Sequence, residues 1–227
     1  MHGVMKTSFF VSDLHGCADR YAKLFRAIEN ERPSFVFLGG DLLPSYLASQ
    51  TSPDGPGGDF IHDFLRPGFR GLQKTLEREY PGVFLILGND DLRAEETSIR
   101  AGGSGGLWQY VHNRRVRLGD FTLYGYSFVP PTPFSLKDWE RYDVSAYVDP
   151  GCTHPMEGRH SVPVTERELK YATIKDDLEK LVESADLARS FFLFHTPPHD
   201  TCLDRAALDG RMIDHVPLDV HVGSIAV

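Results

Sequence analysis

The fold is decided by the stretch Ser-Asp-Leu-His-Gly at residues 12–16, which joins an apolar run at residues 8–11 to a helix-like segment at residues 18–29. An acid and an imidazole here follow a predicted buried strand directly. The oxygen of Asp13 and the nitrogen of His15 together suit Mn, Fe, Zn or Ni better than Ca. Asp and Gly after a strand are also typical of a simple turn and helix cap, so this stretch alone leaves both interpretations open.

Three further apolar runs end in residues that bind metals. Because ligands gather at the carboxyl ends of strands in open α/β sheets, four such endings in series favour a site over four unrelated turns. The later runs and their endings are residues 35–38 before Gly39-Gly40-Asp41, residues 83–87 before Gly88-Asn89-Asp90-Asp91, and residues 191–194 before His195-Thr196-Pro197-Pro198.

The ordered motifs Asp-x-His-Gly, Gly-Gly-Asp, Gly-Asn-x-Asp and His-x-Pro-Pro resemble those of the calcineurin-like metallophosphoesterase family. The match spans nearly the whole chain. It implies an α/β fold, a layered α/β/β/α sandwich with mixed sheets, formed by residues 1–227 as a single domain. The family's last motif, Gly-His-x-His, has no counterpart before Val227, so we expect a C-terminally incomplete domain, either a truncation or a natural short form.

The same resemblance implies a dinuclear metal centre. Asp13 and His15 would hold the first ion, Asp41 would bridge both, and Asn89 and His195 would hold the second. A carboxylate suits the bridging position because its two oxygens can serve two cations about 3.5–4 Å apart. We expect two divalent ions, Mn, Fe, Zn or Ni, with Mn the first choice in vitro. His195 needs a hydrogen-bond acceptor at its second nitrogen to set its tautomer.

This donor set implies hydrolysis of a phosphomonoester or phosphodiester by a metal-activated water. Family members commonly have a His that serves the leaving oxygen where this chain has Asp90. A carboxylate near two metal ions is ionised and a poor proton donor, so the catalytic candidates are Asp90, by position, and His199, as another acid. The alternative is a weakly active or inactive scaffold of the same fold, which the missing motif favours. No substrate-binding residue is predicted.

The amino-acid composition limits the classes of partner and substrate that we expect. The 227 residues carry 24 Lys and Arg against 32 Asp and Glu, and this net charge of −8 disfavours nucleic acid as a partner. A small phosphate ester or nucleotide remains the expected substrate, because bound cations reverse the local charge. The scattered Cys17, Cys152 and Cys202 predict reduced thiols in a cytoplasmic protein. No apolar run is long enough to span a membrane, and homo-oligomer formation is left open.

The sequence of the second half of the chain predicts further secondary-structure elements. A hairpin turns at Gly119-Asp120, and one long helix covers residues 165–189 before the strand at residues 190–194. Residues 127–163 form a long loop that either lines a substrate pocket or packs on its own aromatic side chains. The remaining histidines are interpreted as surface or hydrogen-bonded residues. They are His62, His112, His154, His160, His215 and His221.

Overall fold

The computed structural model describes residues 7–45, 59–206, 212–213, 216–217 and 220–227, so His215 lies outside the described residues. Its first sheet has the order β1-β2-β3-β4 with all neighbours parallel. This confirms the parallel unit predicted around residues 12–16. The strands are β1 (Ser8–Val11), β2 (Phe35–Gly39), β3 (Gly82–Ile86) and β4 (Gln109–Tyr110).

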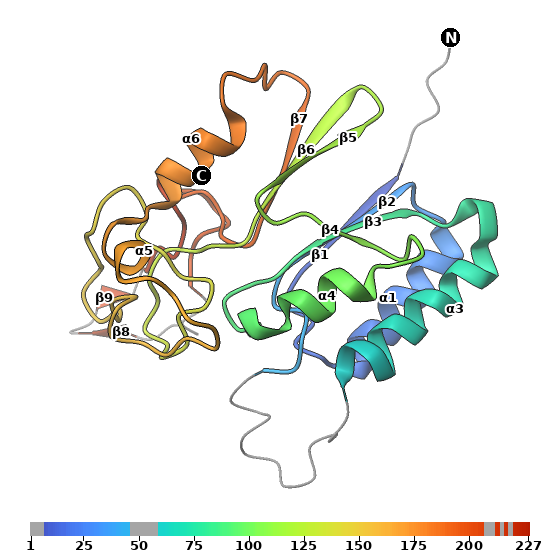
Figure 1. Ribbon diagram of the computed structural model, residues 1–227, viewed down its shortest axis with the longest axis horizontal. Coiled ribbons are helices and arrows are strands. Elements are labelled where there is room, and N and C mark those ends of the chain that lie inside the picture. Colours follow the sequence, from blue (N-terminus) through green and yellow to red (C-terminus); the bar gives the residue numbers. More distant parts are fainter. Residues whose placement is uncertain (1–6, 46–58, 207–211, 214–215, 218–219) are drawn as a thin grey trace, which may run out of the picture.

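Helices cover one side of this sheet, where α1, α3 and α4 lie together in Figure 1. In α1 (Ala18–Glu31), Tyr21, Leu24 and Ile28 are buried, which is the spacing of one helix face. The remaining elements of this half are the π-helix η1 (Phe60–Leu65), α3 (Arg66–Leu76), the 3-10 helices η2 (Glu77–Glu79) and η3 (Arg93–Glu95), and α4 (Glu96–Gly102).

The second sheet is mixed and has the order β5-β6-β7. Strands β5 (Arg114–Leu118) and β6 (Phe121–Tyr126) are antiparallel, which confirms the predicted hairpin, and β7 (Ser190–Phe194) pairs with β6 in parallel. A separate antiparallel pair is formed by β8 (Met212–Ile213) and β9 (Val216–Pro217).

Apolar side chains from both sheets form one buried cluster between them. Phe84 and Ile86 of β3 meet Leu123 of β6 and Leu193 of β7 there. The two sheets therefore pack face to face, and helices lie outside the first sheet. This arrangement is consistent with the α/β/β/α sandwich predicted from the sequence.

The long helix predicted at residues 165–189 is wrong. The structure has two short helices, α5 (Glu166–Tyr171) and α6 (Ile174–Val182). Each starts at a threonine: Thr165 Oγ1 accepts the N–H of Glu168 at 3.2 Å, and Thr173 caps the second helix in the same way. Thr173 is also extended and bridges to Tyr142 of the preceding loop, which interrupts the helix.

The loop at residues 127–163 contains no helix or multi-residue strand but is well packed. The Trp139 side chain is fully buried, and Lys137 and Glu140 form a buried ion pair beside it. The carboxylate of Asp138 accepts the backbone N–H of Arg93 at 2.7 Å, which ties this loop to the segment after β3. The loop thus packs both on its own side chains and on residues outside it, such as His112 against Trp139. That it lines a substrate pocket stays a prediction.

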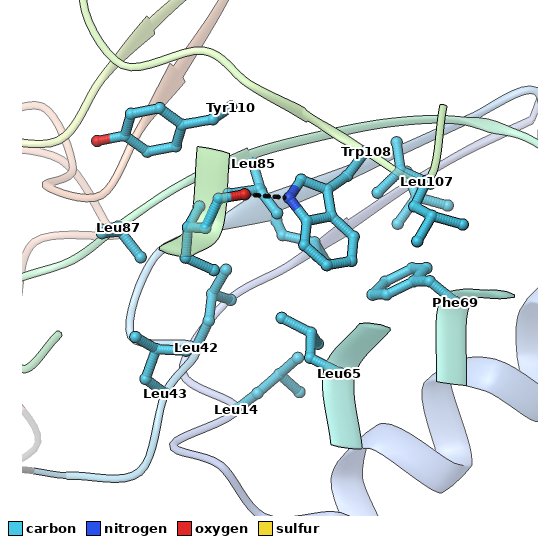
Figure 2. Packing of buried hydrophobic residues seen from close by; sticks show 14 of the residues in the cluster. Leu14, Leu42, Leu43, Leu65, Phe69, Leu85, Leu87, Leu107, Trp108 and Tyr110 are labelled. Atoms are coloured by element: carbon cyan, nitrogen blue, oxygen red, sulfur yellow. Dashed lines mark hydrogen bonds between the residues drawn. The ribbon is translucent and has the colours of Figure 1, made fainter. Parts of the chain in front are cut away.

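A leucine-rich core lies under the turns that follow β1 and β2. Figure 2 shows Leu14, Leu42 and Leu43 beside Leu65 of η1. All four side chains are at most 5% exposed. Because Leu14 separates Asp13 from His15, and Leu42 follows Asp41, burying these leucines holds the intervening polar residues at the surface of the core.

None of the helices among the described residues is long and apolar enough to cross a membrane. Cys17, Cys152 and Cys202 are all free thiols, as predicted.

Candidate metal centre

Three of the predicted ligands have left-handed backbone conformations. The φ angles are 57° at Asp13, 47° at His15 and 53° at Asp41. Non-glycine residues rarely adopt this region, and such strain persists where the surrounding structure over-determines it, often at functional sites. The two turns therefore hold their polar side chains in orientations that a relaxed turn would not provide.

Backbone hydrogen bonds join these two turns beyond the ends of their strands. The N–H of Asp13 donates to the carbonyl of Gly40 at 3.1 Å, and the N–H of His15 donates to the carbonyl of Asp41 at 2.8 Å. The guanidinium of Arg20, in the first turns of α1, donates to the carbonyl of Asp13 at 2.5 Å. The turns thus form one rigid unit that carries Asp13, His15 and Asp41 together.

Asp41 lies between two histidines from different sheets. Its Oδ1 is 3.3 Å from Nε2 of His195, and its Oδ2 is 3.9 Å from Nε2 of His15. The Nε2 atom of His15 is also 3.9 Å from Oδ1 of Asp13, and the donor atoms of Asp13, His15 and Asp41 all lie within 4.8 Å of one another. One oxygen of Asp41 faces each histidine, an arrangement that suits a bridging carboxylate.

His195 has the hydrogen bond that its predicted role required. Its Nδ1 lies 2.8 Å from the carbonyl oxygen of Gly39, so Nδ1 carries a proton and donates it. The Nε2 atom faces Oδ1 of Asn89 at 3.0 Å and Oδ1 of Asp41. This tautomer leaves Nε2 as the nitrogen that can bind a metal.

In the metal-free protein, the electrostatics of His195 and Asp41 favour a proton on the nitrogen where a metal would bind. Burial lowers the pKa of His195, but the hydrogen bond and charge of Asp41 outweigh this effect and raise the pKa to about 9. For Asp41, burial raises the pKa, yet His195 and the N–H of Asp90 lower it below its ordinary value. The metal-free pair is therefore an imidazolium and a carboxylate, and a cation must displace the proton on His195.

Two glycines leave room for this close arrangement. A Cβ atom on Gly88 would lie 2.3 Å from Oδ1 of Asp41 and 2.7 Å from Nε2 of His195. A Cβ atom on Gly40, whose φ is 101°, would lie 2.6 Å from Nδ1 of His195. A side chain at Gly88 would displace Asp41 and His195, and a side chain at Gly40 would displace His195.

Asp90 contacts the centre through His15. Its Oδ2 lies 3.2 Å from Nδ1 of His15, and its Oδ1 accepts the hydroxyl of Ser45 at 3.1 Å. An acid on one imidazole nitrogen orients the ring and directs the other nitrogen toward a metal. The geometry thus suits Asp90 to positioning His15, and the sequence pattern contained no signal for this contact.

Asp91 is fully buried and organises the backbone under the centre. Its carboxylate accepts the N–H groups of Leu42, Leu43 and Gly88 at 3.1, 2.7 and 2.9 Å. Burial raises the pKa of Asp91 to about 7, and the charge of Asp41 adds to this effect. A single side chain therefore connects the turns after β2 and β3.

The structure thus brings together the five predicted ligands Asp13, His15, Asp41, Asn89 and His195. It places His199, the predicted acid, against Asp204 and His221. The catalytic roles of Asp90 and His199 stay predictions.

Comparison with known proteins agrees with this geometry. A family model described as calcineurin-like phosphoesterase matches residues 7–216. The chain belongs to the calcineurin-like phosphoesterase family. Membership in this family suggests metal-dependent hydrolysis of phosphoesters, and the donor groups of the centre fit divalent cations.

Two solved crystal structures are similar to this member of the calcineurin-like phosphoesterase family. One has a TM-score of 0.53 at 14% identity, over 98% of this chain and 78% of the other. The second, TT1561 of Thermus thermophilus, has a TM-score of 0.49 at 14% identity, over 88% of this chain and 72% of the other. At this identity the first shows the fold alone. No curated protein matches the chain.

Proposed function

We propose that this protein is a metal-dependent phosphoesterase that hydrolyses a phosphomonoester or phosphodiester with water as the nucleophile. The observation that carries the proposal is the position of Asp41, whose two oxygens face His195 at 3.3 Å and His15 at 3.9 Å. A carboxylate with an imidazole on each side suits two cations bound side by side.

The residues divide into two donor groups around Asp41. Asp13 and His15 supply an oxygen and a nitrogen on one side, and Asn89 and His195 do so on the other. Divalent ions held there supply Lewis acidity, which activates water and offsets charge on the phosphoryl oxygens.

The protein's own groups keep this centre ready. The carbonyl of Gly39 fixes the tautomer of His195, and Asp90 orients His15. Asn89 adds a ligand without charge, so the site keeps a smaller negative charge than a third carboxylate would give it. The strained turns after β1 and β2 keep the donor atoms of Asp13, His15 and Asp41 within 4.8 Å of one another before any ion arrives.

The choice of cation and substrate follows from these donors. Mixed oxygen and imidazole donors suit Mn, Fe, Zn or Ni, and Mn²⁺ is the ion we propose for assays in vitro. Small phosphate esters or nucleotides in the cytoplasm are the proposed substrates, since the net charge of −8 opposes long polyanions.

The test is to load the purified chain with Mn²⁺, remove free metal, and measure bound Mn per chain. Hydrolysis of p-nitrophenyl phosphate and of bis-p-nitrophenyl phosphate is measured on the same sample. We expect close to two ions and metal-dependent hydrolysis, and the ratio of the two rates separates monoesterase from diesterase activity. Retained metal without hydrolysis of either ester would support the scaffold alternative and overturn the proposal.

The decisive variant is Asp41→Asn, which keeps the shape and an acceptor for the Asp90 N–H but removes the charge. We expect it to lose at least one ion and to slow hydrolysis by about 100-fold or more. The control is Asp120→Asn, at a carboxylate whose side chain is 82% exposed in the β5–β6 turn, and it should keep both properties.

A further inference from the structure

A second group of metal-binding side chains lies away from the family's centre. It consists of His199, Asp204 and His221, whose donor atoms all lie within 4.8 Å of one another. The Nδ1 atom of His221 is 2.9 Å from both oxygens of Asp204, and Nδ1 of His199 is 3.5 Å from Oδ2. The centroids of the two imidazole rings are 5.3 Å apart, and the rings are inclined by 60°. Each ring points its Nδ1 atom toward the carboxylate of Asp204.

These distances match a coordination shell. Zinc bonds of about 2.0–2.2 Å at tetrahedral angles place neighbouring donor atoms about 3.4 Å apart. The contacts of 2.9 and 3.5 Å bracket this spacing.

The backbone holds each of the three residues in place. His221 forms an antiparallel bridge with Arg205, and the N–H of Val222 donates to the carbonyl of Asp204 at 2.8 Å. The N–H of His199 donates to the carbonyl of Ser224 at 2.9 Å. The three side chains are therefore brought together by isolated backbone bridges, and their arrangement is preorganised.

Burial gives the cluster an inner and an outer side. The side chain of Asp204 is fully buried, and the N–H of Asp200 donates to its Oδ2 at 2.7 Å. The side chains of His221 and His199 are 27% and 42% exposed, so they form the solvent side. The two rings thus lie between the buried carboxylate and solvent.

We propose that His199, Asp204 and His221 form a mononuclear site for a divalent transition metal ion, Zn²⁺ above all. Two imidazoles and one carboxylate with an open position are a known zinc donor set, and nitrogen donors favour Zn²⁺ over Mn²⁺. The bound ion would cross-link the segment after β7 to the last residues of the chain.

This site is independent of the proposed hydrolytic function. It gives His199 a different role from the acid predicted from sequence, because an imidazole nitrogen that binds zinc cannot also donate a proton. Metal binding is therefore the readout, and hydrolysis is not needed to test it.

The experiment measures Zn²⁺ bound to the full chain in the Asp41→Asn background, which removes the bridging ligand of the first centre. Calorimetry and bound zinc per chain are compared with and without His199→Ala, which removes an exposed ring and keeps the Asp204–His221 contact. We expect zinc at this site to bind at least tenfold more weakly in the His199→Ala chain. The control is His62→Ala, at a histidine 44% exposed and 3.8 Å from Asp59, and it should leave binding unchanged.

A second measurement identifies the donors directly. X-ray absorption of the zinc-loaded Asp41→Asn chain should show nitrogen and oxygen donors with imidazole scattering, and this imidazole scattering should decrease after His221→Ala. If zinc binding is unaffected by both histidine substitutions, or the Asp41→Asn chain binds no zinc, the cluster is a hydrogen-bonded carboxylate and the proposal is wrong.

Discussion

Nε2 of His195 lies 3.3 Å from Oδ1 of Asp41, although the two residues follow strands of different sheets. The same imidazole donates from Nδ1 to the carbonyl of Gly39, at the end of β2. The candidate metal centre therefore spans the junction of the two sheets. Its geometry depends on how the sheets pack as well as on the turns that carry the ligands.

Asp13 offers a test of the strained turn. With φ at 57° and an exposed side chain, it can be replaced by Gly or by Ala, and both remove the carboxylate. We expect Asp13→Gly to be more stable than Asp13→Ala by about 1 kcal/mol, because the left-handed conformation strains Ala and does not strain Gly. Urea unfolding in a chelator measures the difference, and both variants should lose metal-dependent hydrolysis.

The control for this pair is Asp19, an exposed residue in the first turn of α1. In a helix the order reverses, and Asp19→Ala should be more stable than Asp19→Gly by up to about 1 kcal/mol. Equal stabilities of the two Asp13 variants would show that the turn relaxes in solution and stores no strain.

A substitution at Asp90 can distinguish a role in positioning His15 from a role as the catalytic acid. Because it binds Nδ1 of His15, Asp90→Ala should weaken Mn²⁺ binding by about 10- to 100-fold. At saturating Mn²⁺ we expect most of the kcat to return for esters with both good and poor leaving groups. A kcat that stays low only for poor leaving groups would instead support Asp90 as the acid. Metal titrations of the rate with two esters distinguish these results.

Asp91 is predicted to be the largest stability determinant of the centre. Asp91→Ala leaves the N–H groups of Leu42, Leu43 and Gly88 buried without their acceptor, and should lower the free energy of unfolding by about 3 kcal/mol or more. Asp91→Asn keeps one acceptor oxygen and should cost less. Urea unfolding in a chelator is the measurement, and a loss below about 1 kcal/mol would contradict this account.

His112 predicts a pH dependence of stability. Its ring lies 5.0 Å from Trp139, and its Nδ1 accepts the N–H of Ser127 at 2.9 Å. Burial, with the positive charges of Arg93 and Arg141, lowers the pKa of His112 from 6.5 to about 3. Below pH 6.5 the unfolded chain therefore binds a proton that the folded chain does not, so acid lowers the free energy of unfolding.

Between pH 6.5 and 3, the free energy of unfolding should fall by about 1.4 kcal/mol for each unit of pH. His112→Asn keeps an acceptor near the Ser127 N–H and removes the titrating group. Chelator-treated wild type should lose stability faster than this variant as pH falls, with no difference in slope above pH 6.5. Parallel curves across the whole range would mean that His112 is protonated in the folded chain.

Acidic pH should also weaken metal binding at the first centre. The pKa of His195 in the metal-free protein is raised to about 9, so the proton on Nε2 competes with the cation throughout the neutral range. Mn²⁺ affinity should rise as pH increases toward 9. Calorimetric titration at several pH values checks this, and a proton released on binding near neutral pH is the expected signature.

Much of the first centre followed from sequence, because strand and turn patterns are local. An apolar run followed at once by Asp, Asn or His indicates a candidate ligand at a strand end without knowledge of the rest of the fold. The βαβ unit, the hairpin at Gly119-Asp120 and the polar residues at the strand ends were predicted in this way, and the resemblance to the family implied the ligand set at Asp13, His15, Asp41, Asn89 and His195. The helix at residues 165–189 was wrong because the bridge from Thr173 to Tyr142 overrides local helical periodicity.

What tertiary structure alone decided is how these groups meet. The contact of His15 with Asp90, the N–H groups of Leu42 and Leu43 on Asp91, and the contact of His221 with Asp204 all join residues that are not neighbours in the chain. His221, interpreted from sequence as an ordinary histidine, reaches Asp204 only because backbone pairing places their segments side by side. Residue patterns record interactions between neighbours along the chain, whereas these contacts depend on sheet packing and loop pairing, which no short pattern encodes.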